Sequence, residues 1–590
     1  MYSFIKNTLS SALGVILAIG VLSVIGIIFL IGAAASSSET TSIKNKSVLY
    51  IPLNGVMQEQ AVEDPLTDLI GSKGTNLGLN QLCQAIKKAK DMKELKGIYL
   101  EAGLLQSDPA SLEELRKYLE DFKKSGKFIF AYGNNYTQGS YYLCSVADKM
   151  ALNPIGMIDW KGLASQPIFF KDMMAKFGVK MQVFKVGTFK SAVEPFTSTE
   201  MSAANRKQVT SYLGSIWNNF VSSVSVSRKI SKDSLMAYAD KFAGFASATD
   251  LVKKHMVDTL TYLDGAKLML KTYVGIGTDK KLNMVSAADV YAANGGKSKS
   301  SSNKIAVYYA AGDIVDNDVQ EFSNESMICA PTVIKDLEDL QNNKDIKAVV
   351  MRINSGGGSA YASEQIWHAM KELSKKKPLI VSMGGMAASG AYYMSSASQY
   401  IFAEPTTLTG SIGIFGMIPD FSTLLNDKLG LKFDEVKTNK MSDFGTIARP
   451  LNTEESQLLQ GYIEKGYALF VSRVANGRNK TAQQVDEIGQ GRVWTGEQAI
   501  KNGLVDKLGT LDDAIGYAAK KAGLGNDYET TDNPTPEPWY ITLIQNKKNQ
   551  YYETKMRATL GQYYQSFILL KTLTNRSYVQ ARIPYSPNIY

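Results

Sequence analysis

Short apolar runs alternate with longer amphipathic stretches along most of the chain. KAVVMRI, residues 347–353, is a β-rich apolar run, and in the SEQIWHAMKELSKK that follows, apolar positions recur with helical spacing. KPLIVSM, residues 377–383, is apolar again, and IAVYYAAGDIV, residues 305–315, has the pattern of an opening strand. Strands that alternate with helices in this order predict parallel βαβ units, and therefore an α/β fold.

The same order of elements occurs twice. The segment that starts at Lys96 aligns without a gap on the segment that starts at Lys347, at a constant offset of 251 residues. Glycine, proline and tyrosine positions coincide at this offset: Gly139 with Gly390, Pro154 with Pro405, and Tyr141 and Tyr142 with Tyr392 and Tyr393. We therefore interpret the chain as two tandem copies of one α/β unit, the first of which opens with SVLYIPLNG, residues 47–55.

The repeat divides the chain into five predicted parts. These are a membrane anchor at 1–45, a first α/β repeat at 46–293, a linker at 294–303, a second α/β repeat at 304–525, and a linker with an aromatic and basic tail at 526–590. The first linker reads NGGKSKSSSN, which is polar and rich in small residues. The tail has a mixed apolar and basic face, so it could lie on lipid or pack between subunits.

The N-terminal apolar stretch is of a different kind. Residues 9–35 carry no charge and are long enough to cross a bilayer as a helix at about 1.5 Å per residue. A cleaved signal peptide has a shorter apolar core of about 7–15 residues, although the GAAASSS at the end of this stretch resembles a cleavage site. We predict a single-pass anchor with the short N-terminus inside and the rest of the chain outside, and cleavage is the alternative.

Charge and cysteine content exclude function classes. The formal net charge is +9 over 590 residues, and the lysines are scattered over helix faces, which argues against nucleic acid as a partner. Cys83, Cys144 and Cys329 are widely spaced and odd in number, so they have neither a metal-site spacing nor the pattern of a disulfide framework. We interpret them as buried apolar thiols.

The two copies differ at positions that suggest chemistry. Ser389, in MGGMAASGAYY, aligns with Gln138, and the loop NSGGGS at 354–359 aligns with GLLQSD at 103–108. A glycine-rich loop lets backbone N–H groups face an anion, and beside a serine it can form an oxyanion hole. A tight strand-to-helix turn would explain the loop alone, but it does not explain why loop and serine are absent together from the first copy.

A nucleophilic serine needs a base, and the two histidines are poor candidates. His368 lies in a helical pattern and His255 lies away from any motif, so we interpret both as structural. Lys190, in VFKVGTFKSAVEPF, has apolar neighbours; such a lysine either extends its amine to solvent or is buried, with a pKa lowered toward about 7–8. At an offset of 252, Lys190 aligns with Ser442, so the first copy supplies the lysine and the second the serine.

Four strings together resemble one protease family: GTFKSAVEPF, INSGGGS, SMGGMAASGAYY and LTGSIGIFG. They resemble the signal peptide peptidase A family in its long, two-copy form, a group of Ser/Lys proteases in the Clp–crotonase-like superfamily, over residues 46–525. The resemblance implies that Ser389 is the nucleophile, that Lys190 is the general base and that Ser411 orients the lysine. It also implies oxyanion donors among the backbone N–H groups of Gly357, Gly358 and Gly390.

The resemblance carries further expectations. It implies two tandem spiral-like α/β units, a homo-oligomer that is commonly a tetramer, and no metal or organic cofactor. The implied substrates are signal peptides left in the membrane, and the implied location is the inner membrane with the catalytic part on the periplasmic side. One position departs from the family pattern, because Gly356 stands where the family has a proline; a looser loop with activity retained is the expectation.

Two other function classes stay open at this point. A crotonase-type acyl-thioester enzyme would use the glycine loop but would not need a serine and a lysine from different repeats. A non-catalytic membrane scaffold would need none of these residues. The sequence also leaves open whether Lys190 reaches Ser389 within one chain or across a subunit boundary.

Overall fold

The computed structural model describes residues 14–15, 17–18, 43–60, 76–293, 301–317, 327–535 and 579–583. The predicted anchor helix at 9–35 lies almost wholly outside these residues, as does most of the predicted linker at 294–303. Within the described part of the chain, no helix combines the length and the apolar character that crossing a bilayer requires.

The first repeat is built on a parallel seven-stranded sheet with the order β2-β1-β3-β4-β5-β7, and β8 also pairs with β1. Its strands are β1 (Ser47–Gln58), β2 (Asn76–Gly78), β3 (Leu95–Gln106), β4 (Phe128–Gly133), β5 (Lys149–Leu152), β7 (Thr259–Leu260) and β8 (Asn283–Ser286). Its longer helices are α3 (Leu79–Asp91), α4 (Pro109–Lys123), α8 (Ala203–Arg228), α9 (Lys232–Asp240) and α11 (Leu263–Val274). Its shorter helices are α5 (Gln138–Cys144), α6 (Lys171–Phe177), α7 (Glu194–Thr197), η1 (Ala243–Phe245), α10 (Ala248–Lys253) and α12 (Ala287–Ala292).

The second repeat is built on an eight-stranded sheet with the order β18-β16-β14-β12-β9-β20, to which β15 and β19 add beside β14. Its strands are β9 (Lys304–Ala311), β12 (Ile346–Ser355), β14 (Leu379–Ala388), β15 (Tyr400–Ala403), β16 (Leu408–Gly410), β18 (Val493–Thr495), β19 (Lys507–Leu508) and β20 (Glu529–Asn533). Its helices are α13 (Ala330–Asn342), α14 (Ala360–Lys376), α15 (Gly390–Ser395), η2 (Thr423–Lys428), α16 (Thr453–Arg478), α17 (Ala482–Ile488), α18 (Gly496–Lys501) and α19 (Leu511–Lys521).

The two copies share their local architecture as the alignment predicts. In both, a strand runs into a short loop, a helix and a second strand: β3, α4 and β4 in the first copy, and β12, α14 and β14 in the second. The aligned residues Asp108 and Ser359 both cap these helices, because their side chains accept hydrogen bonds from Ser111 N (2.8 Å) and Ala362 N (3.2 Å). The predicted α/β fold with two tandem units is therefore present.

The central strands of the second sheet are buried on both faces. Along β12, Val349 and Met351 pack into one core cluster, and Ala348 and Val350 pack into another on the opposite side. Successive side chains of a strand point to opposite faces, so an unbroken apolar run is what a doubly covered parallel sheet needs.

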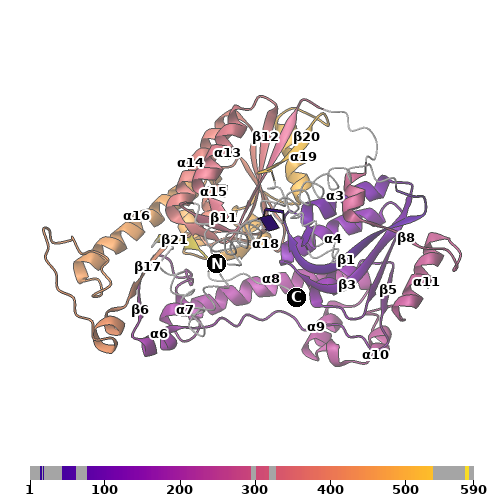
Figure 1. The fold of residues 1–590 in the computed structure, drawn as a ribbon, viewed down its shortest axis with the longest axis horizontal. Helices are drawn as coiled ribbons and strands as arrows, with labels where there is room; N and C mark the ends of the chain where they lie inside the picture. The colour runs from indigo at the N-terminus through magenta and orange to yellow at the C-terminus, as the bar shows by residue number, and fades with distance from the viewer. Residues whose placement is uncertain are drawn as a thin grey trace, which may run out of the picture.

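A third sheet joins parts of the chain that lie far apart in sequence. Its order is β11-β10-β13-β21-β17-β6, with β6 (Lys180–Lys185), β10 (Asp313–Val315), β11 (Met327–Cys329), β13 (Gly357–Ser359), β17 (Phe415–Asp420) and β21 (Val579–Arg582). The first-repeat strand β6 pairs antiparallel with the second-repeat strand β17, with Lys185 opposite Phe415. Figure 1 shows β6 and α6 beside β17 and α16, away from the rest of the first repeat. This pairing carries the chain after β6 into the second repeat.

The segment predicted as a linker and tail at 526–590 contains two strands. Glu529–Asn533 forms β20, which extends the second sheet beside β9, and Val579–Arg582 forms β21 inside the third sheet. The sequence ETTDN is polar because it lies at a sheet edge, and VQAR is too short to show a period. The alternatives of lipid contact and subunit packing therefore do not describe residues 579–583, which pack within their own chain.

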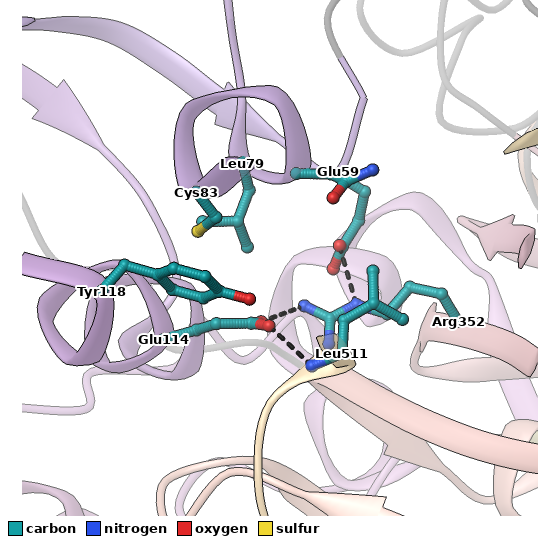
Figure 2. Close-up of a pocket in the computed structure, with 8 residues that line it drawn as sticks. Glu59, Leu79, Cys83, Glu114, Tyr118, Arg352 and Leu511 are labelled. Atoms are coloured by element: carbon teal, nitrogen blue, oxygen red, sulfur yellow. Dashed lines mark hydrogen bonds and ion pairs between the residues drawn. The ribbon is translucent and has the colours of Figure 1, made fainter. Parts of the chain in front are cut away.

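Buried charges hold the two repeats together. Arg352, on β12, donates from Nε to Glu59 (2.8 Å) and from Nη2 to Glu114 (2.6 Å), both of which belong to the first repeat. Figure 2 shows the guanidinium between these carboxylates, in a pocket also lined by Tyr118 and Cys83. All three charged side chains are buried, so the relative position of the repeats is fixed by a specific polar contact.

Candidate active site

Ser389 occupies a strained turn between β14 and α15. Its backbone angles are φ 57° and ψ −114°, in a region that residues with a side chain rarely adopt, and its N–H donates to Gly410 O at 2.8 Å. A serine on such a strand-to-helix turn projects its hydroxyl away from both elements. Backbone strain of this kind costs about 1–3 kcal/mol and is typical of functional sites.

Lys190 reaches Ser389 from the other repeat within one chain. It lies in the loop between β6 and α7, and its Nζ is 2.7 Å from Ser389 Oγ. The same Nζ is 3.2 Å from Ser411 Oγ and 3.4 Å from the Ser411 carbonyl oxygen. The structure thus brings together the three side chains that the sequence singled out, although Lys190 and Ser389 are 199 positions apart.

The surroundings of Lys190 favour the neutral amine. Burial lowers the pKa of Lys190 well below its ordinary value of 10.5, and the positive charge of Arg582 lowers it further. The side chain is 1% exposed, and its hydrogen-bond partners are serine oxygens, which carry no charge. A lysine without a compensating carboxylate can serve as a base near neutral pH.

Ser411 lies on the other side of the lysine, in the loop after β16. Its φ is 49°, so it shares the left-handed conformation of Ser389, and its N–H donates to Arg492 O at 2.7 Å. Because its backbone is fixed by that bond, its hydroxyl is held where it contacts Lys190 Nζ.

Two glycines and a glutamine hold the lysine loop, and sequence reasoning missed them. A Cβ on Gly491 would lie 2.6 Å from Lys190 N, and one on Gly413 would lie 3.2 Å from Lys190 Cδ. Gln208, on α8, donates to the carbonyl oxygen of Phe189 and accepts from Val493 N at 3.1 Å. The glycines of GQGRV, residues 489–493, carried a signal for close backbone approach, but nothing in the sequence connected them to Lys190.

The glycine loop lies beside the serine turn. Gly357 has a φ of 98°, and the space of a Cβ there is filled, since Gly390 N lies only 2.8 Å from that position. Gly357 donates its own N–H to Ser355 Oγ at 3.1 Å. Of the three predicted oxyanion donors, Gly358 and Gly390 are therefore the two whose N–H groups this contact leaves for a ligand. Gly356 lies in the same loop, and its carbonyl oxygen accepts from Ile583 N at 3.0 Å.

The aligned positions of the other copy do not form a second site. Gln138, which stands where Ser389 does, is buried and accepts hydrogen bonds from Lys161 N (3.1 Å) and Gly162 N (3.0 Å). Ser442, which aligns with Lys190, is exposed and accepts from Asn439 N at 3.2 Å. One copy of the turn is thus filled by structural hydrogen bonds.

The remaining candidate residues lie elsewhere. His368 on α14 and His255 after α10 are both exposed, whereas Ser389 and Lys190 are buried, so neither histidine is placed as a base. Cys83 and Cys144 are buried, as predicted, and burial raises the pKa of both thiols, while Cys329 is partly exposed.

Comparison with known proteins agrees with this geometry. Residues 121–277 and 371–525 both match the model of peptidase family S49, which confirms the two-copy arrangement, and residues 319–407 match that of Clp protease. The chain is 35% identical to Protease 4 of Haemophilus influenzae, over 85% of this chain and 83% of that protein. It is 30% identical to the chloroplastic serine protease SPPA of Arabidopsis thaliana, over 82% of this chain and 70% of that protein.

A shorter relative matches a smaller part of the chain. The putative signal peptide peptidase SppA of Enterococcus faecium is 33% identical over 38% of this chain and 65% of its own length. The two family matches and the long relatives together cover both repeats, including the loops that carry Lys190, Ser389 and Ser411. The chain therefore belongs to peptidase family S49 and is a serine protease.

Proposed function

We propose that this protease is a membrane-anchored endopeptidase in which Ser389 is the nucleophile and Lys190 is the general base, and that it degrades signal peptides remaining in the membrane. The observation that carries the proposal is the 2.7 Å contact between Lys190 Nζ and Ser389 Oγ inside a buried site. A base within this reach of a hydroxyl can take its proton as the hydroxyl attacks.

The reaction proceeds in two halves. Neutral Lys190 accepts the proton of Ser389 while Oγ attacks the peptide carbonyl, and the ammonium then gives that proton to the leaving amine. Water, deprotonated by the same lysine, releases the acyl group from Ser389. Ser411 keeps the amine directed at Oγ through both halves, because its own backbone is fixed by Arg492 O.

The negative charge on the attacked carbonyl needs donors. The N–H groups of Gly358 and Gly390 fit this role, since a Cβ on Gly390 would lie 3.3 Å from Gly358 N, which places the two glycines side by side. Gly390 is the first residue of α15, where a backbone N–H has no acceptor within its helix. Donors fixed in place before the reaction stabilise the tetrahedral intermediate without having to reorganise.

The membrane part of the proposal rests on the sequence and on a relative. The uncharged residues 9–35 would anchor the chain in the inner membrane, with both repeats on the periplasmic side. The name of the Enterococcus faecium relative links this family to signal peptides. An anchored site would meet such peptides at the membrane surface.

A homo-oligomer is also part of the proposal. The segment 429–447 exposes apolar side chains in succession, namely Leu429, Leu431, Phe433, Val436, Phe444 and Ile447. A surface of this kind is typical of a protein interface. The resemblance to the long two-copy proteases makes a tetramer the expected assembly.

The experiment that tests the substrate class uses detergent-solubilised full-length protein and synthetic peptides. Apolar signal-peptide segments should be cut at internal bonds by the wild type and by H368A, and left intact by S389A. Mass spectrometry of the products provides the measurement. If the wild type cut casein but no apolar segment, the protease assignment would stand and the substrate proposal would be wrong.

A further inference from the structure

Strand β21, residues 579–583 with the turn that follows, lies beside the proposed catalytic residues. It pairs antiparallel with β13 of the glycine loop on one side, with Gly358 opposite Ala581, and antiparallel with β17 on the other, with Phe415 opposite Gln580. An extended peptide that fills a gap between two strands is a common way for a protease or peptide-binding domain to hold its ligand. The chain thus places its own backbone where a substrate strand would pair.

Ala581 is the residue of this strand that lies at the glycine loop. Its carbonyl oxygen is 2.0 Å from the position of a Cβ on Gly357 and 3.0 Å from that of a Cβ on Gly390. Gly390 N and Gly358 N border the same two positions, at 2.8 Å and 3.3 Å. The Ala581 carbonyl therefore lies among the backbone groups proposed to hold the oxyanion.

The residues after Ala581 continue along the site. Ile583 N donates to Gly356 O at 3.0 Å, and Arg582 forms an ion pair with Asp313. The charge of Arg582 contributes to lowering the pKa of Lys190, which puts the Arg582 side of the peptide near the proposed base. The strand consequently runs past Lys190 with the bond between residues 581 and 582 at the centre of the site.

Burial supports the same placement. Ala581 is 0% exposed, and Ser389 and Lys190, at 0% and 1%, are covered as well. The position opposite Gly358 accepts a methyl side chain in the apolar core cluster that also includes Ile314 and Ala391. A small side chain at the acylated position is what this enclosure selects.

We propose that residues 579–583 are a built-in substrate strand, and that the enzyme cuts its own chain between Ala581 and Arg582. This inference rests on the proposed function of Ser389 and Lys190. Until the cut is made, the strand excludes other peptides from the site, so the same segment is both an inhibitor and the first substrate.

The cleavage follows the ordinary chemistry of the site. Ser389 Oγ forms an ester with the Ala581 carbonyl carbon, its proton passes to Lys190 Nζ, and the C–N bond to Arg582 breaks as its nitrogen receives that proton. Water then hydrolyses the ester and restores the Ser389 hydroxyl. The products are a chain that ends in the Ala581 carboxylate and a free peptide of residues 582–590.

Intact-mass measurement of purified full-length protein tests the cut. The wild type should lose the mass of residues 582–590 over time, and S389A should keep it. A581G, which keeps a small residue, should still be cut, whereas A581W should not, because its indole cannot enter a fully enclosed position. If the wild type stayed at full length, or if A581W lost the same peptide, the proposal would be overturned.

Peptide binding separates occupancy of the site from the cut. In the S389A background, a fluorescent apolar peptide should bind at least about tenfold more tightly to a chain ending at residue 578 than to the full-length chain, the factor expected when an occupant fills nine sites in ten. Equal affinities would overturn the inhibitory role. A wild type that cuts added peptides but not itself would disprove this inference alone, whereas one that cuts neither would disprove the proposed function.

Discussion

At the scale of single residues, the site combines a strained serine with a buried, unpaired amine. Ser389 and Ser411 both adopt positive φ values of 57° and 49°, and each is fixed by a backbone hydrogen bond to the loop that follows. Lys190 lies between their hydroxyls. Such strain persists only where the surroundings determine the conformation, which is what a fixed Ser–Lys distance requires.

The depressed pKa of Lys190 predicts a pH profile. Only the neutral amine can accept the Ser389 proton, so kcat/KM should fall as pH falls through the lysine pKa, and the activity should be fully present above it. Because burial places this pKa well below 10.5, the fall should lie at a lower pH than an exposed lysine would give.

Steady-state kinetics across a series of buffers measures that profile. H368A should keep the same acidic limb, because that histidine is exposed and is not the base. A limb that vanished in H368A would transfer the base role to histidine and contradict the assignment of Lys190.

At the scale of elements, the third sheet explains how residues from two repeats meet. Pairing of β6 with β17 delivers the lysine loop to the second repeat, and Gln208 on α8 connects that loop to β18. Gly491 then touches the backbone of Lys190 from the side of β18. The catalytic distance therefore depends on backbone contacts as much as on the catalytic side chains.

A pair of glycine variants tests this dependence. Gly491 (φ 78°) and Gly523 (φ 70°) share a left-handed backbone, but a Cβ on Gly491 would lie 2.6 Å from Lys190 N and one on Gly523 would meet nothing within 4 Å. Both changes to alanine should cost about 1–2 kcal/mol of unfolding free energy. Displacement of the lysine should in addition lower kcat of G491A by about 100-fold.

Denaturant melts and peptide hydrolysis, measured on the same preparations, separate the two effects. G523A should melt earlier and still cut at the wild-type rate. Equal activity of G491A and G523A would show that Gly491 has no positioning role.

The sequence predicts the repeated elements and the catalytic side chains, because these leave local or internal signals. The apolar period reveals β12, α14 and β14, and the divergence of the copies exposes Ser389 and Lys190. Gln208, Gly491 and β21 could not be predicted in the same way. Their roles depend on backbone contacts across 19 to about 300 positions, which no pattern within a window records.

At the scale of the whole molecule, each repeat contributes one half of a single site. The first repeat lacks the serine and the second lacks the lysine, so their relative position decides whether the protein can act at all. Arg352 with Glu59 and Glu114, and Lys117 with Glu404, fix that position through buried ion pairs. Removing one partner of such a buried pair typically costs about 3–5 kcal/mol, since the other charge is left uncompensated.

The most direct test of the account is the rate at which a serine-reactive phosphonate probe labels Ser389, mapped by peptide mass spectrometry. The wild type should be labelled at Ser389, K190A should be labelled about 100-fold or more slowly because no base activates the hydroxyl, and K190A mixed with S389A should stay slow because both residues belong to one chain. Labelling of K190A at the wild-type rate would contradict the account.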